Sequence, residues 1–149
     1  MLRRLTAGIL AGAVVFSIWW VQAPPRDETS YRESAETTIR KLSSRLETAR
    51  LWVDELERGR VQKPAVKISL EEAETGASSA LSRFEGYDPP RGLERLRSEV
   101  STLGTRLESA LGDLRIASEQ GRWAELPTLA AGLPKLASRL DHLSDEVEP

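Results

Sequence analysis

The side chains that could do chemistry in this sequence are few, and their spacing does not favour catalysis. The only histidine is His142, with Asp145 and Glu146 three and four residues further on. This spacing could hold a metal ion weakly on a helix. A hydrolytic triad needs a histidine base beside its nucleophile, and a di-iron bundle needs two Glu-x-x-His motifs. We interpret His142 as part of a solvated helix end and expect a non-enzymatic protein without catalytic, cofactor-binding or metal-binding residues.

The remaining charged residues are typical of helix surfaces. Glu71 and Glu72 are adjacent, so on a helix they point about 100° apart and cannot share a proton as an acid/base pair would. The whole chain has a net charge of -2 with the two signs mixed, which gives no support for nucleic-acid binding. Cysteine is absent, so neither disulfides nor thiolate chemistry are available.

One group of residues has the composition of a protein-binding surface. Two tryptophans, Trp52 and Trp123, should meet at one end of the fold. Basic residues near them include Arg58, Arg60 and Lys63, interspersed with acidic ones. Tryptophan and arginine dominate protein-binding hot spots, so these five residues are the candidate partner-binding site. The alternative is that both tryptophans only close the end of a helical bundle.

The element that places the whole molecule is the apolar run from Leu5 to Val21. It carries no charge, follows Arg3 and Arg4, and contains the pair Trp19 and Trp20, which suit the membrane interface. As a helix it would span about 25 Å, near the short limit for a bilayer core. We expect residues 1–23 to be an uncleaved signal anchor in contact with membrane lipid.

Two further predictions concern this segment. A cleavage site after Ala23 would release the protein, although Pro24 in the next position disfavours cleavage. Gly8 and Gly12 could let two anchors pack as a weak homodimer. We expect a single-pass protein of the cytoplasmic membrane, with its N-terminus inside and its C-terminus outside, or alternatively a secreted one.

Residues 30–149 follow a polar joint at 24–29 and read as an all-α domain. Capping boxes at Ser30 and Ser69, and Asp88 before two prolines, predict helix starts. Gly59 and Gly121 predict helix ends, and Pro134 should kink or split the last helix. The predicted helices span 30–58, 69–86, 89–120 and 123–147.

Each predicted helix carries apolar residues at steps of three and four, which is a heptad-like seam. The seams are Ala35, Ile39, Leu42, Leu46, Ala49, Val53 and Leu56; then Leu70, Ala73, Ala77, Ala80 and Phe84; then Leu93, Leu96, Val100, Leu103, Leu107, Ala110, Leu114 and Ala117; and last Leu126, Leu129, Leu133, Leu136, Leu140, Leu143 and Val147. Short turns between them favour an antiparallel four-helix bundle. An extended coiled coil that dimerises is the main alternative, because seams do not identify the partner helix.

Three segments carry a resemblance: the helix start at residues 69–74 (SLEEAE), the turn at 87–90 (YDPP), and residues 114–117 (LRIA) before Gly121. The chain resembles uncharacterised small bacterial proteins with one N-terminal export segment and an extracytoplasmic helical bundle, and this resemblance implies no known activity. It is also similar to four-helix sensory modules of bacterial receptors.

Two functions follow as hypotheses. The first is a membrane-tethered interaction or scaffold module with a protein partner. The second is a sensory bundle or one that binds a small apolar ligand, where Ala73, Gly76 and Ala77 would leave room between helices.

Overall fold

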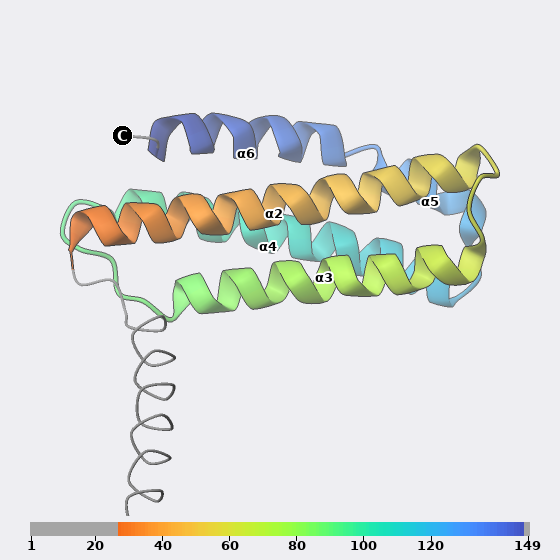
Figure 1. The fold of residues 1–149 in the computed structure, drawn as a ribbon, viewed down its shortest axis with the longest axis horizontal. Helices are drawn as coiled ribbons and strands as arrows, with labels where there is room; N and C mark the ends of the chain where they lie inside the picture. Colours follow the sequence, from red (N-terminus) through yellow and green to blue (C-terminus); the bar gives the residue numbers. More distant parts are fainter. Residues whose placement is uncertain (1–26, 148–149) are drawn as a thin grey trace, which may run out of the picture.

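The computed structural model describes residues 27–147, which form a bundle of helices with no strand among these residues (Figure 1). Successive long helices run in opposite directions, so the α2–α3 loop and the turn after α4 lie at the same end of the bundle (Figure 1). The elements are α2 (Glu28–Glu57), α3 (Lys63–Glu85), α4 (Glu94–Glu119), the 3₁₀ turn η1 (Trp123–Glu125), α5 (Leu126–Ala130) and α6 (Leu133–Val147).

Helix α2 begins earlier than predicted, because Asp27 caps it rather than Ser30. The Asp27 Oδ1 atom accepts a hydrogen bond of 2.8 Å from the backbone N–H of Ser30. This bond lowers the pKa of the Asp27 carboxyl below its usual value. The predicted Ser30 capping box is therefore wrong. Tyr31, in the first turn of this helix, is buried in the core.

Helix α3 also begins earlier than predicted, at Lys63, so the capping box at Ser69 is wrong as well. Pro64 lies in the first turn of the helix. A backbone N–H there would have no partner within the helix, so proline costs nothing at this place. The extra turn brings Val66 into the core, fully buried.

Helix α4 begins later than predicted, at Glu94. Asp88 and Pro89 each precede a proline, and a residue in that position is disfavoured from helical geometry. The chain therefore stays irregular up to Gly92, which has a φ of +91°. This left-handed backbone conformation is accessible to glycine. The N–H of Gly92 donates a hydrogen bond of 2.8 Å to the Glu94 carboxylate, which secures the helix start.

The predicted helix ends and the predicted break are confirmed. Gly59 and Gly121, with φ of +66° and +71°, follow α2 and α4. The last segment is divided into η1, α5 and α6, with the break between α5 and α6 at residues 131–132, just before Pro134.

The heptad seams correctly predicted the core. Of the predicted seam residues, Leu56, Leu96, Ala110, Leu129 and Leu136 are only partly buried, and the others are buried. The buried residues that the seams missed are Tyr31, Thr38, Val66, Leu81, Gly104, Leu111, Ser118 and Ala130.

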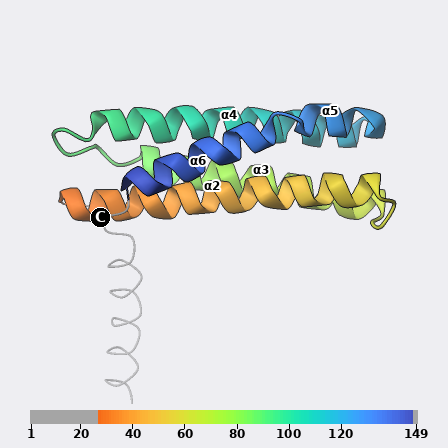
Figure 2. The ribbon, with the colours of Figure 1, turned by 90° about the horizontal axis from the view of Figure 1, so that it is seen from above.

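The helices are not packed with equal closeness. Helix α3 has extensive contacts with both α2 and α4, whereas α6 lies mainly on α2 and has fewer contacts with α4. Viewed from above, α6 crosses the bundle obliquely between α4 and α2 (Figure 2). Among residues 27–147, no helix is both long and apolar enough to span a bilayer.

Candidate partner-binding end and a groove between α4 and α6

We call the end of the bundle that carries the α2–α3 loop and the α4–η1 turn the loop end, comprising residues 50–68 and 115–126. The structure places all five candidate partner-binding residues at this end. The five residues thus share one end of the bundle, and their role in binding stays a prediction. The basic residues of this group do not all contact the tryptophans, and their contacts are described one by one below.

Lys63 and Trp123 form the one cation–π pair of the described residues. The Lys63 Nζ atom lies 5.6 Å from the ring centroid of Trp123. Each residue is the first of its element, α3 and η1 respectively, so the pair joins two chain turns that are far apart in sequence. Trp123 and Trp52 are both partly buried against the core, which fits the alternative reading that they help to close the bundle.

The two arginines of the candidate site are paired rather than free. The Glu55 carboxylate accepts from Arg58 at 2.8 Å and from Arg60 at 3.3 Å. Their net contribution to the surface potential is therefore about one positive charge instead of two. An incoming acidic partner would have to compete with Glu55 for them.

Three apolar side chains at the same end were not among the residues predicted to bind a partner. Leu51, Ile68 and Ile116 are 58%, 57% and 38% exposed, and they are the exposed large hydrophobic residues of the described part of the chain. They belong to three different helices, and all lie at the loop end. The missed signal is that each is a large apolar residue outside the seam of its helix.

The predicted space for a small ligand is filled. Ala73 and Ala77 are fully buried in the core. The Arg45 side chain of α2 lies directly over Gly76, where even a Cβ atom would collide with the guanidinium. The small residues of α3 thus bring helices together instead of leaving a cavity, and the prediction of ligand space there is wrong.

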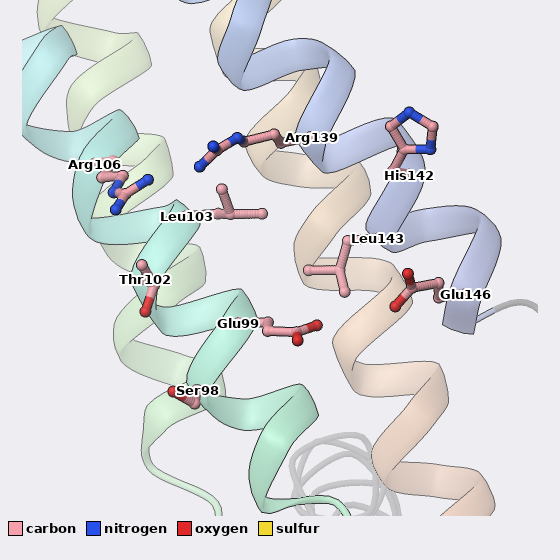
Figure 3. A pocket seen from close by; sticks show the side chains of 9 residues that line it. All are labelled: Ser98, Glu99, Thr102, Leu103, Arg106, Arg139, His142, Leu143 and Glu146. Carbon is pink, nitrogen blue, oxygen red and sulfur yellow. The ribbon is translucent and has the colours of Figure 1, made fainter.

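A groove that the sequence analysis did not foresee lies between α4 and α6. It has a volume of about 350 Å³. Figure 3 shows the nine side chains that line it, from Ser98, Glu99, Thr102, Leu103 and Arg106 of α4 and from Arg139, His142, Leu143 and Glu146 of α6.

His142 is exposed, as predicted, and lies at the outer edge of this groove (Figure 3). Within residues 27–147 no three histidine, aspartate or glutamate side chains are close enough together to hold a metal ion.

The opposite side of α4 has a different electrostatic arrangement. Arg115 of α4 donates to the Glu74 carboxylate of α3 and lies 2.9 Å from that of Glu119. The hydrogen bonds to Glu74 and Glu119 raise the pKa of the Arg115 guanidinium further above its usual value. Opposite charges therefore meet across the α3–α4 contact.

The predicted membrane-interface residues Arg3, Arg4, Trp19 and Trp20 lie outside the described residues, as do Gly8 and Gly12. Comparison with known proteins agrees with the expectation that the chain has no family of known activity: no family model, curated protein or solved structure matches it.

Proposed function

We propose that this protein is a non-enzymatic interaction module that binds a protein partner through the loop end. The observation that carries the proposal is that Leu51, Ile68 and Ile116, on three different helices, all lie at this end. Removing the apolar surface of a leucine or isoleucine side chain from water is favourable by about 25 cal/mol for each Å² that is covered. A partner that reaches all three helices at this end and covers these side chains recovers this free energy.

The Lys63–Trp123 pair complements these apolar residues. A tryptophan held in place by packing on one side and a cation on the other is already ordered before binding. Binding of a partner then causes a smaller loss of conformational entropy at the Trp123 side chain. The paired arginines Arg58 and Arg60 add donors at the rim, where charged groups influence the rate and specificity of association more than its strength.

We further propose that residues 1–23 tether the module to the cytoplasmic membrane with the bundle outside. This rests on the uncharged run from Leu5 to Val21 and the arginines before it. Protease added to intact spheroplasts should digest the bundle, and N-terminal sequencing should find residue 1 or 2 in the mature protein. A mature N-terminus at Pro24 would show instead that the protein is released.

The partner-binding proposal is tested by quantitative recovery of membrane partners with the tagged full-length chain. Leu51→Ser and Ile68→Ser change exposed side chains and should leave the fold intact. Together they should lower partner recovery about tenfold, in the range of hot-spot losses. Trp52→Ala and Trp123→Ala test the aromatic part, with circular dichroism to check that each variant still folds.

The matched control is Arg91→Ser, which changes an exposed side chain in the loop before α4, outside the loop end. It should leave recovery unchanged. Equal recovery with the Leu51→Ser/Ile68→Ser double variant and with the unchanged protein would refute a role for the loop end.

A further inference from the structure

The α4–α6 groove has the size and floor of a small-molecule site. Leu103 and Leu143 lie between its walls and are 8% and 4% exposed, so the floor is apolar. Its volume of about 350 Å³ lies in the range of small-molecule pockets, which are mostly apolar with a few polar groups that orient the ligand.

The groove follows from the break in the last helical segment. Because the chain interrupts its helix before Pro134, α6 takes its own direction and packs mainly on α2. It thereby diverges from the first half of α4, as the view from above shows (Figure 2). Side chains from the two helices face each other across the opening without closing it (Figure 3).

Like charges face one another across this groove. On α4, Glu99 and Arg106 are seven residues apart, which is two helical turns or about 10 Å along one face. On α6, Arg139 and Glu146 have the same separation in the reverse order. Since the helices are antiparallel, Arg106 faces Arg139 at one end and Glu99 faces Glu146 at the other (Figure 3).

The two ends differ in how their charge is balanced. At the acidic end, Arg95 donates a hydrogen bond of 2.7 Å to the Glu99 carboxylate. At the basic end, neither Arg106 nor Arg139 has a carboxylate oxygen within 4.0 Å anywhere in residues 27–147. The charge missing from the groove is therefore negative.

We infer that the groove binds a compact organic anion, with its carboxylate, sulfonate or phosphate between Arg106 and Arg139 and its apolar body over Leu103 and Leu143. Guanidinium groups form strong, oriented hydrogen bonds with such anions. Two arginines from different helices converge on one anion, which also removes their mutual repulsion. The ligand site is separate from the loop end, so it stands or falls independently of the proposed function.

The test uses the full-length chain in phosphatidylcholine nanodiscs with isotope-labelled leucine methyl groups. Three probes share one apolar body and differ in charge: 2-naphthoate, 2-naphthamide and 2-naphthylmethylammonium. We expect 2-naphthoate to shift the Leu103 and Leu143 methyl signals saturably, and the other two to cause much smaller shifts. Equal shifts with all three probes would overturn the inference, because the arginines would then contribute nothing.

Variants locate the site of the anion. Arg106→Gln and Arg139→Gln change exposed side chains, so the fold should be retained, and each should weaken 2-naphthoate binding about threefold to tenfold. Arg83→Gln removes an exposed arginine from α3, outside the groove, and should leave the affinity unchanged. An unchanged affinity in both groove variants would also refute the inference.

Two further arms separate the sources of the anion. Inorganic phosphate alone should bind more weakly than 2-naphthoate, and equal affinity would refute the role of the apolar floor. Phosphatidylglycerol added to the nanodiscs should reproduce the methyl shifts without 2-naphthoate if a lipid headgroup is the natural source. Shifts with 2-naphthoate alone support a soluble anion.

Discussion

Helix α4 has two flanks, and they differ in how the neighbouring helix is held. On the flank toward α3, Gly104 lets Leu81 approach so closely that a Cβ atom would lie 2.6 Å from its Cδ1 atom. On the flank toward α6, Thr102 and Arg106 stand at the edge of an open groove (Figure 3). Both flanks belong to one regular helix, and the difference arises from the residues that α4 presents on each side and from the course of the neighbouring helix. We call the flank toward α3, at Gly104, the closed flank and the flank toward α6 the open flank.

The two flanks also differ in their charges, and the flank toward α3 has a polar surface groove of its own, of about 390 Å³, lined in part by Glu74 and Arg115. Arg115 and Glu74 bring opposite charges together across the closed flank, while Arg106 and Arg139 bring like charges together across the open one. Attraction across the closed flank adds to the fit of the side chains. Across the open flank, repulsion between the two exposed arginines opposes packing by a small amount. The comparison therefore predicts that equivalent substitutions on the two flanks will have different, even opposite, effects on stability.

The largest difference in the free energy of unfolding between variants of the two flanks is expected when side-chain volume is added. Gly104→Leu would force the closed flank apart and should lower the free energy of unfolding by about 2–3 kcal/mol. Thr102→Leu places the same side chain at an exposed position of the same helix, at the groove, and should change it by less than about 0.5 kcal/mol. Urea unfolding of both variants, followed by circular dichroism, measures the contrast. Equal losses would mean that the two flanks are packed alike.

A smaller effect on the free energy of unfolding is expected from a change at Tyr31, which is buried where α2 packs on α3. Its ring packs on Phe84 of α3 with 5.3 Å between ring centroids, and its buried hydroxyl has no hydrogen-bond partner among the described residues. Tyr31→Phe removes this unsatisfied hydroxyl. At neutral pH the variant should be as stable as the unchanged protein or more stable by about 1 kcal/mol.

The same residue predicts a dependence on pH. Burial raises the pKa of Tyr31 above its usual value of 10.0. The unfolded chain therefore loses this proton first as the pH rises, so the contribution of Tyr31 to stability is complete below pH 10 and is lost at higher pH. Melting temperatures measured at pH 7 and pH 11 should fall less in Tyr31→Phe than in the unchanged protein. An equal fall would place the titrating group elsewhere.

The closed part of the bundle was predictable from sequence, because burial repeats along each helix every three or four residues. Leu107 and Leu114, for example, are buried as their positions in the seam predict. Helix starts were predicted less well, since Ser30 and Asp27 are both good capping residues and the seam, whose first residue is Ala35, is compatible with either. A seam predicts which face of a helix is buried, but it does not determine which residue caps the start of the helix.

The open groove was not predictable in the same way. The break before Pro134 was foreseen, but the direction that α6 takes after it depends on contacts with α2. The charge pattern was visible in the sequence, as Glu99 with Arg106 and Arg139 with Glu146 at equal spacing. Without knowing that α4 and α6 are neighbours running in opposite directions, this spacing does not show that like charges meet.

The smallest predicted effect concerns those like charges. Arg139→Gln should raise the free energy of unfolding by about 0.2–0.5 kcal/mol, because it removes the repulsion from Arg106 at an exposed site. Arg115→Gln, on the closed flank, should lower it, because Glu74 and Glu119 lose their partner. Both effects should shrink as salt rises from 0.05 to about 0.5 M, where screening acts over a few Å. If Arg139→Gln instead lowers the stability at low salt, then Arg139 is held by an attraction, and the groove has no unbalanced positive charge to offer a ligand.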